Sequence, residues 1–250
     1  MTRPSRWLFV SDVDDTLLGD EAGLRQLARM LQAQPHLITV YNSSRPCASL
    51  RQTLAQVVSL PFPNYLIGGL GTEIQKGVSG EVIEPYNRLL KRATFRQGER
   101  LWDRERIMTL LNKLGLIAHP SEFQTPFKVS YDLPDPAMLT QVFDHLATTS
   151  LEVKVIYSGG KNLDIIPRVS GKGSAVEYLH RRLGIPPERV VVAGDSGNDL
   201  EMFVAPYKGI IVANATAELK QKQGDRIYHA QAAHAAGVLE GLRFWQVVQN

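Results

Sequence analysis

The sequence predicts an α/β fold: a Rossmann-like parallel-sheet core with an inserted α+β cap domain. Short apolar runs alternate with segments of helical apolar spacing near the start of the 250-residue chain and again near its end. Such alternation implies a parallel sheet covered by helices on both faces. In the middle of the chain the pattern changes. We therefore expect residues 1–82 and 161–250 to form the core and residues 83–160 to form the cap.

The first part of the chain predicts three strands separated by two helices. The apolar runs of residues 7–11, 37–41 and 65–67 are typical of short buried strands. Apolar residues at helical spacing fill the two gaps between these runs: Leu24, Leu27, Ala28 and Leu31 in the first, and Leu50, Leu54, Val57 and Val58 in the second.

The middle of the chain predicts helices packed on one face of a small sheet. One helix is expected around residues 107–114 and another around residues 139–146. A strand over residues 127–133 has one apolar and one polar face, because side chains alternate along a strand. The polar face either meets water or closes over a hydrophilic substrate. Its residues are Lys128, Ser130 and Asp132, and the apolar ones are Phe127, Val129, Tyr131 and Leu133.

The last part of the chain returns to the first pattern. We expect a helix over residues 174–183, a strand over 189–192, a helix around 200–204, a strand over 209–212 and a final helix that carries Val238, Leu239 and Leu242. These elements would complete the sheet of the core.

Composition excludes several classes of protein. The single cysteine, Cys47, excludes an internal disulfide, and the apolar run at residues 7–10 is too short for a signal peptide. No apolar stretch approaches the ~20 residues of a membrane helix, so we expect a cytoplasmic protein without a membrane partner. The net charge is +3, and acidic residues interrupt the basic segment 88–106. We interpret that segment as a solvated helical face and expect no nucleic-acid partner.

The strongest chemical signal is the run Asp12-Val13-Asp14-Asp15-Thr16, which follows the first expected strand. Catalytic groups in such sheets gather beyond the carboxyl ends of strands. Two carboxylates two residues apart can divide the work there: one attacks phosphorus and coordinates a metal, and the other handles the proton of the leaving oxygen. An ordinary acidic turn is the alternative.

A second acidic run, Gly194-Asp195-Ser196-Gly197-Asn198-Asp199, follows another expected strand. Mg²⁺ takes oxygen ligands, usually one or two carboxylates with water and substrate phosphate. Asp12 and Asp195 can supply those carboxylates, and Asn198 and Asp199 can orient them. The two runs together predict Mg²⁺ as a cofactor.

A phosphate group also needs cations and hydrogen-bond donors. Ser43 and Ser44 follow the expected strand 37–41 and offer hydroxyl and backbone N–H groups. Lys172 lies between two glycines at a helix start, where the helix terminus adds its own positive field. We expect these three residues and Asn198 to bind phosphate.

Taken in order, the run 12–16, Ser43, Lys172 and the run 194–199 resemble the four motifs of the haloacid dehalogenase-like phosphatase superfamily. The resemblance spans almost the whole chain, and the inserted cap resembles the larger α/β cap class. It implies a catalytic set in which Asp12 is phosphorylated, Asp14 is the general acid and base and lends its backbone carbonyl to Mg²⁺, Asp195 binds the metal, Ser43 and Lys172 hold the phosphoryl group, and Thr16 and Asp199 support them.

Within the superfamily the chain is similar to sucrose-phosphate phosphatases. The similarity rests on Gly71–Ile74, Pro126–Tyr131, Ser158–Lys161, Asp164 and the tail around His234. It implies a small sugar phosphate as substrate, foremost sucrose-6-phosphate, with mannosyl-3-phosphoglycerate or another sugar phosphate as the alternative. A sugar-phosphate synthase is the candidate protein partner. The expected sugar-binding residues are Lys128, Ser158, Lys161 and Asp164.

One position departs from that family pattern. Ser43-Ser44-Arg45 stands where the family usually has threonine, glycine and arginine. The hydroxyl is kept, but Ser44 bears on the shape of the loop and hence on catalytic efficiency.

Two non-enzymatic alternatives compete with a phosphatase. A degenerate module would only bind a sugar phosphate, and the intact Asp12 and Asp14 argue against it. A receiver-like phospho-acceptor also uses aspartates, Mg²⁺ and lysine, but it needs no cap of this size. We therefore predict a phosphoric monoester hydrolase.

Overall fold

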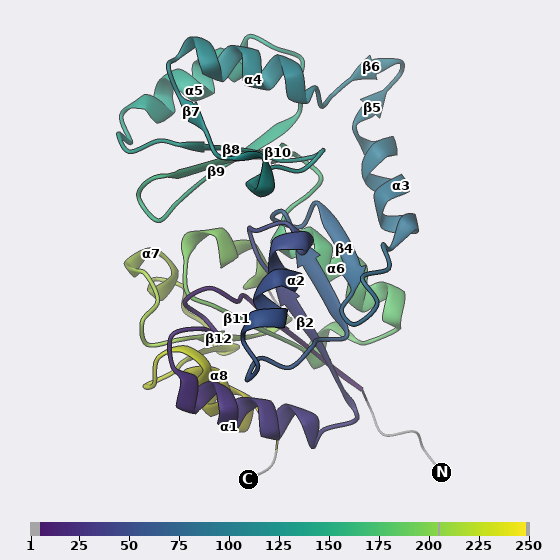
Figure 1. Ribbon diagram of the computed structural model, residues 1–250, viewed down its shortest axis with the longest axis vertical. Helices are drawn as coiled ribbons and strands as arrows, with labels where there is room; N and C mark the ends of the chain where they lie inside the picture. Colours follow the sequence, from purple (N-terminus) through teal and green to yellow (C-terminus); the bar gives the residue numbers. More distant parts are fainter. Residues whose placement is uncertain (1–5, 205, 249–250) are drawn as a thin grey trace.

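Seven strands form the central sheet of the core, in the order β13-β12-β11-β1-β2-β3-β4. The computed structural model of the protein, shown in Figure 1, describes residues 6–204 and 206–248. Every neighbouring pair in this sheet is parallel except β3 and β4, which confirms the predicted parallel core. The strands are β1 (Trp7–Ser11), β2 (Leu37–Asn42), β3 (Tyr65–Gly68), β4 (Glu73–Lys76), β11 (Val190–Gly194), β12 (Lys208–Ile211) and β13 (Ile227–His229).

Helices connect these strands and cover the sheet. The helix α1 (Glu21–Gln32) begins at Asp20, whose carboxylate accepts from the amide of Ala22 at 3.1 Å. It packs against α8 (His234–Phe244) at the end of the molecule farthest from the cap (Figure 1). The other core helices are α2 (Cys47–Gln56), α3 (Glu84–Ala93), α6 (Lys172–Leu183), α7 (Ala217–Lys220) and the short 3₁₀ helices η2 (Pro187–Arg189) and η3 (Gly197–Met202).

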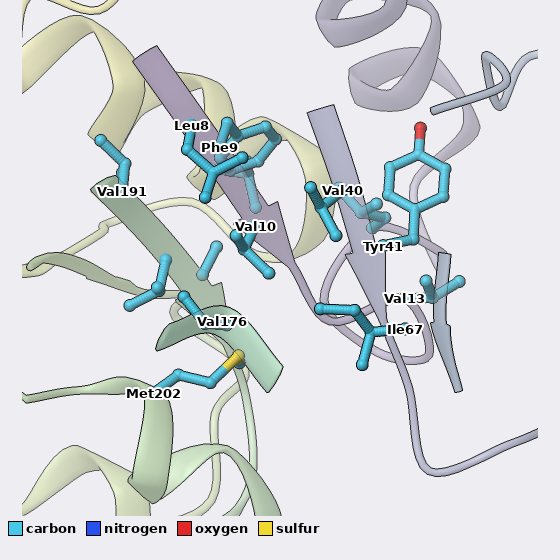
Figure 2. Close-up of a cluster of buried hydrophobic side chains, with 14 of the residues drawn as sticks. Leu8, Phe9, Val10, Val13, Val40, Tyr41, Ile67, Val176, Val191 and Met202 are labelled. Atoms are coloured by element: carbon cyan, nitrogen blue, oxygen red, sulfur yellow. The ribbon is translucent and has the colours of Figure 1, made fainter. Parts of the chain in front are cut away.

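The apolar strands are buried because helices cover both faces of the sheet. Phe9, Val40 and Val191 have no exposed surface, and Figure 2 shows such side chains from neighbouring strands packed together. Val176 of α6 and Met202 of η3 belong to the same buried cluster. Close packing of this kind fixes the strand ends, and with them the loops that carry the predicted acidic runs.

The cap is a four-stranded antiparallel sheet in the order β7-β8-β10-β9. Two helices, α4 and α5, lie on its outer side, so its other face turns toward the core (Figure 1). Val129, Tyr131 and Leu133 are fully buried in a second apolar cluster. The elements of the inserted part are β5 (Phe95–Arg96), β6 (Glu99–Arg100), α4 (Arg104–Lys113), β7 (Ile117–Ala118), η1 (Ser121–Phe123), β8 (Val129–Asp132), α5 (Met138–Ala147), β9 (Val153–Ser158) and β10 (Asn162–Pro167).

Both predicted boundaries of the cap differ from the packing. Tyr86 and Leu90 of α3 are buried in the core cluster, so the core continues beyond residue 82. The strand β10 pairs with β8 and β9, so the cap continues beyond residue 160. We propose a cap of residues 94–167. The apolar stripe of α3 gives no local indication of which unit it packs against.

Three smaller expectations also differ. The helix α2 ends at Gln56, ahead of two nearby prolines, and Val58 is 94% exposed rather than buried. The helix expected around residues 200–204 is the earlier 3₁₀ turn η3. The basic segment 88–106 is not one helical face, because it spans the end of α3, the β5–β6 hairpin and the start of α4.

Among the helices that the structure describes, none has the length and apolar character needed to cross a membrane. The cytoplasmic location expected from the sequence stays a prediction.

Candidate active site

Three predicted site residues follow three neighbouring parallel strands. Asp12 follows β1, Ser43 follows β2 and Asp195 follows β11, and these strands lie side by side in the sheet. Because the carboxyl ends of parallel strands meet at one edge, the three side chains gather there. Lys172, the first residue of α6, completes the group.

Lys172 is the centre of a buried ion-pair network. Its Nζ donates to Asp12 Oδ1 at 2.7 Å and to Asp199 Oδ1 at 2.6 Å, and its side chain has no exposed surface. Burial alone would lower the pKa of Lys172, but the charges of Asp12 and Asp199 outweigh it and raise the pKa above 10.5. The lysine therefore stays charged at neutral pH.

Three buried carboxylates surround that single lysine. Asp12, Asp195 and Asp199 each place an oxygen within 4.8 Å of the others. Burial, followed by the charge of Asp199, raises the pKa of Asp195 to about 7. Burial also raises the pKa of Asp12, although Lys172 acts in the opposite direction. The cluster has more negative than positive charge, which a divalent cation would balance.

The hydrogen bonds distinguish two candidate metal ligands from a supporting residue. Both oxygens of Asp199 are engaged, Oδ1 by Lys172 and Oδ2 by the amides of Asp195 and Ser196. Asp195 Oδ1 accepts from Thr16 Oγ1 at 3.0 Å. Within the described part of the chain, Asp12 Oδ2 and Asp195 Oδ2 accept no hydrogen bond. Oxygens of this kind fit Mg²⁺.

Asp14 lies at the mouth of this cluster. Its side chain is 48% exposed, and Oδ2 accepts from Arg45 Nε at 2.9 Å. A second nitrogen of Arg45 donates to Thr53 Oγ1 at 2.8 Å. Sequence reasoning named Arg45 within its motif but assigned it no role, and only the fold brings it to Asp14.

Ser43 is buried beside the cluster, with 1% of its surface exposed. Its hydroxyl oxygen accepts from the amide of Arg45 at 3.1 Å, which leaves the hydroxyl proton available to a phosphate oxygen. Ser44 and Asn198 line the adjoining cavity, and within the described residues Asn198 Oδ1 is buried without a hydrogen-bond partner.

The loop after Asp14 is held from a distant part of the chain. The carbonyl of Asp15 accepts from Asn214 Nδ2 at 2.7 Å and from His234 Nδ1 at 3.0 Å. Since a carbonyl only accepts, Nδ1 of His234 carries the proton. Asn214 Oδ1 in turn accepts from the amide of His234 at 2.9 Å. His234 thus begins α8 and also braces the acidic loop.

A cavity of about 370 Å³ lies between core and cap. From the core it is lined by Ser44, Arg45 and Asn198, which are sequence neighbours of Ser43 and Asp199. All four predicted sugar-binding residues line it from the cap: Lys128, Ser158, Lys161 and Asp164. Asp132, which the sequence placed on the same polar strand face without a binding role, also lines it, and nothing in the sequence indicated His119, Pro120, Phe123 and Asn162.

Part of the polar face of the cap sheet is a buried hydrogen-bonded network. Lys128 Nζ donates to Ser130 Oγ at 2.5 Å and to Asp164 Oδ1 at 3.0 Å, and Ser130 Oγ donates to the same oxygen at 2.5 Å. All three side chains are buried. At the rim of the cavity, His119 Nε2 lies 3.2 Å from Asp132 Oδ1.

Comparison with known proteins places this chain in a family. The profile of the sucrose-6F-phosphate phosphohydrolase family matches residues 5–246. The chain belongs to this family. A sucrose-phosphatase of Synechocystis sp. PCC6803, solved in complex with sucrose and phosphate, superposes with a TM-score of 0.87 at 29% identity, covering 98% of this chain and 100% of that one.

Two curated sequences are also similar to the present chain. The mannosylfructose-phosphate phosphatase of Agrobacterium fabrum is 32% identical over 247 residues, 95% of this chain and 96% of that protein. Sucrose-phosphatase 1 of Nicotiana tabacum is 31% identical over 270 residues, which cover 100% of this chain but 61% of the tobacco protein.

Family membership confirms the predicted resemblance to haloacid dehalogenase-like sucrose-phosphate phosphatases. The chain is a phosphoric monoester hydrolase. This sets aside the non-catalytic module and the receiver-like phospho-acceptor.

Proposed function

We propose that the protein is a Mg²⁺-dependent phosphatase that releases phosphate from a disaccharide phosphate, with sucrose-6-phosphate as the first candidate substrate. The observation that carries the proposal is the placement of a buried cluster of aspartates and one lysine beside a polar cavity closed by the cap. The family match supports a sugar phosphate as the ligand of that cavity.

The reaction has two steps. The Asp12 carboxylate attacks phosphorus, the bond from phosphorus to the sugar oxygen breaks, and Asp14 gives its proton to that oxygen. Asp14 then accepts a proton from water, which attacks phosphorus and releases phosphate from Asp12. Asp14 suits both tasks because it is half-exposed at the mouth of the cluster, where water and sugar have access.

Charge on the transferring group is stabilised by residues fixed before substrate arrives. Lys172 provides a permanent positive charge, and the Ser43 hydroxyl provides a donor. Mg²⁺, when bound, supplies two further positive charges; Asp12, Asp195 and the backbone carbonyl of Asp14 would hold it. Thr16 and Asp199 orient Asp195 and Lys172 by the hydrogen bonds described above.

The cap supplies recognition of the sugar. Hydroxyl-rich ligands need converging donors and acceptors, and Lys128, Asp164, Ser158 and Lys161 provide them around the cavity. The A. fabrum relative favours mannosylfructose phosphate as the second candidate substrate. The two substrates differ in the glycosyl residue, since mannose is the 2-epimer of glucose. A partnership with a sugar-phosphate synthase stays a prediction.

Asp12→Asn tests the chemistry. The variant should lose at least about 10³-fold in kcat because asparagine cannot attack phosphorus in this way. Asp144→Asn, an exposed substitution on α5, is the matched control and should retain full activity. Turnover retained by a clean preparation of Asp12→Asn would disprove the nucleophile assignment.

A substrate panel tests the specificity. Phosphate release is measured with and without Mg²⁺ from sucrose-6-phosphate, mannosylfructose phosphate, mannosyl-3-phosphoglycerate, trehalose-6-phosphate and glucose-6-phosphate. We expect sucrose-6-phosphate to give the highest kcat/KM. A higher value for mannosylfructose phosphate would transfer the assignment to the second candidate, and release that does not depend on Mg²⁺ would contradict the metal assignment.

A further inference from the structure

A single ion pair joins the cap to the core within the described part of the chain. Lys154 of the cap strand β9 contacts the carboxylate of Glu201 in the core turn η3. Lys154 Nζ also donates to the carbonyl of Ser170 at 2.7 Å. Ser170 lies in the segment that leads from the cap back to the core, so one lysine holds both the connecting segment and a core turn.

Both partners of Lys154 are close in the chain to the Lys172 ion pair. Ser170 is two residues before Lys172 in the chain, and η3 carries Asp199, which pairs with Lys172. A Cβ built at Gly171, where φ is +139°, would collide with the Glu201 carboxylate and lie 2.8 Å from Lys154 Nζ. The ion pair is therefore packed directly against the backbone of the connecting segment.

The same strand face reaches the substrate cavity. Side chains alternate along a strand, so Lys154, Ile156 and Ser158 lie on one face of β9. Ser158 lines the cavity, and Ile156 pairs in register with Asp164 of β10, which also lines it. Ser158, at the cavity end of β9, is four residues beyond Lys154. At about 3.4 Å per residue, Lys154 therefore anchors this face roughly 14 Å from the cavity end of the strand.

We propose that Lys154 and Glu201 are positioning residues that latch the cap closed over a substrate whose sugar lies against the cap. They set the cap face that carries Ser158 and Asp164 relative to the phosphate site. Lys172 keeps its own contacts with Asp12 and Asp199, so the latch acts on the cap rather than on the reacting group. The inference rests on the proposed function, in which the cap binds the sugar.

The test compares a substrate that fills the cap with one that does not. Lys154→Met removes the charge and keeps the length of the side chain, and Glu201→Gln removes the charge and keeps the shape. Each should lower kcat/KM for the disaccharide phosphate by about fivefold, the upper end of the range for a partly exposed ion pair. Turnover of 4-nitrophenyl phosphate, which lacks a sugar, should change by less than about twofold.

A double-mutant cycle and a matched control complete the kinetic test. In the Lys154→Met background, Glu201→Gln should cost nothing further, because the two side chains act as a pair. Lys76→Met removes a pair of the core surface, in which Lys76 Nζ lies 2.7 Å from Glu81, and should leave both substrates unaffected. Equal losses on both substrates, or no loss on either, would overturn the proposal.

Hydrogen exchange without substrate separates the latch from the proposed function. The amide of Arg168 in the connecting segment donates to the Glu152 carbonyl at 2.9 Å. It should exchange faster in Lys154→Met than in the wild type or in Lys76→Met. Unchanged exchange would refute the latch even if the substrate panel succeeded, and faster exchange would support it even if the panel pointed to another sugar.

Discussion

Replacing Asp195 by asparagine should stabilise the metal-free protein while it removes the response to Mg²⁺. Burial and the charge of Asp199 raise the pKa of Asp195 from 3.8 to about 7, so its ionised form is disfavoured in the folded state. Asparagine keeps an oxygen for the hydrogen bond from Thr16 Oγ1, at 3.0 Å in the wild type. The substitution therefore removes a charge and leaves that contact in place.

Proton linkage gives the sign and the size of the effect. Between pH 3.8 and about 7 the folded state keeps a proton that the unfolded state releases, so the free energy of unfolding falls as pH rises and levels off above pH 7. The difference between the two pKa values corresponds to at most about 4 kcal/mol. The neighbouring carboxylates share the cost of holding negative charge in the buried cluster. We therefore expect Asp195→Asn to raise the free energy of unfolding by about 2 kcal/mol, or Tm by roughly 4–8 °C.

Thermal unfolding in EDTA, at pH 8 and at pH 5, measures this gain for Asp195→Asn against the exposed control Asp144→Asn. The gain should be larger at pH 8 than at pH 5, and Mg²⁺ at pH 8 should raise the Tm of the wild type but not that of Asp195→Asn. An Asp195→Asn variant that melts at or below the wild type in EDTA at pH 8 would refute the reasoning.

Other parts of the molecule give equally specific expectations. Asn214→Asp should lower kcat about tenfold with little change in KM, because a carboxylate oxygen would face the Asp15 carbonyl; steady-state kinetics showing a KM effect alone would contradict this. Leu163→Ala should cost about 2–5 kcal/mol in the free energy of unfolding, measured by urea unfolding with tryptophan fluorescence, since Leu163 is fully buried in the cap; a loss below about 1 kcal/mol would argue against that packing. Cys47 is 0% exposed and burial raises its pKa, so a thiol reagent at pH 8 should modify it only after unfolding, and rapid reaction of the native protein would count against the described burial.

The core of the site was predictable because its geometry follows from strand ends. Asp12, Ser43 and Asp195 each follow a buried run, and parallel strands bring such positions to one edge. Lys172 was predictable from its place at a helix start. The partnership of Arg45 with Asp14 was not, because it joins loops 31 residues apart whose separation depends on the whole sheet.

The cap was predictable only in part. Lys128 and Ser130 lie two residues apart on one strand face, so alternation was a signal that could have added Ser130 to the site. His119 gave no such signal, because it follows β7, a strand of two residues that is too short to show a period. The cap boundary near α3 could not be predicted locally, because Tyr86 and Leu90 form an apolar stripe and only tertiary packing decides what it covers.

The cap network limits what its residues can offer to a ligand. Lys128 has three N–H donors and uses two, on Ser130 and Asp164, so one remains for substrate. Ser130 and Asp164 are directly paired in the β8–β10 register, which fixes the spacing of that remaining donor from Asp164 Oδ2. Because these side chains already hydrogen-bond to one another, the network is preorganised. It selects the arrangement of the ligand's hydroxyl groups with little movement of its own side chains. Discrimination between glucosyl and mannosyl substrates should then depend on the cavity rim, where His119 and Asp132 have exposed surface and fewer fixed contacts.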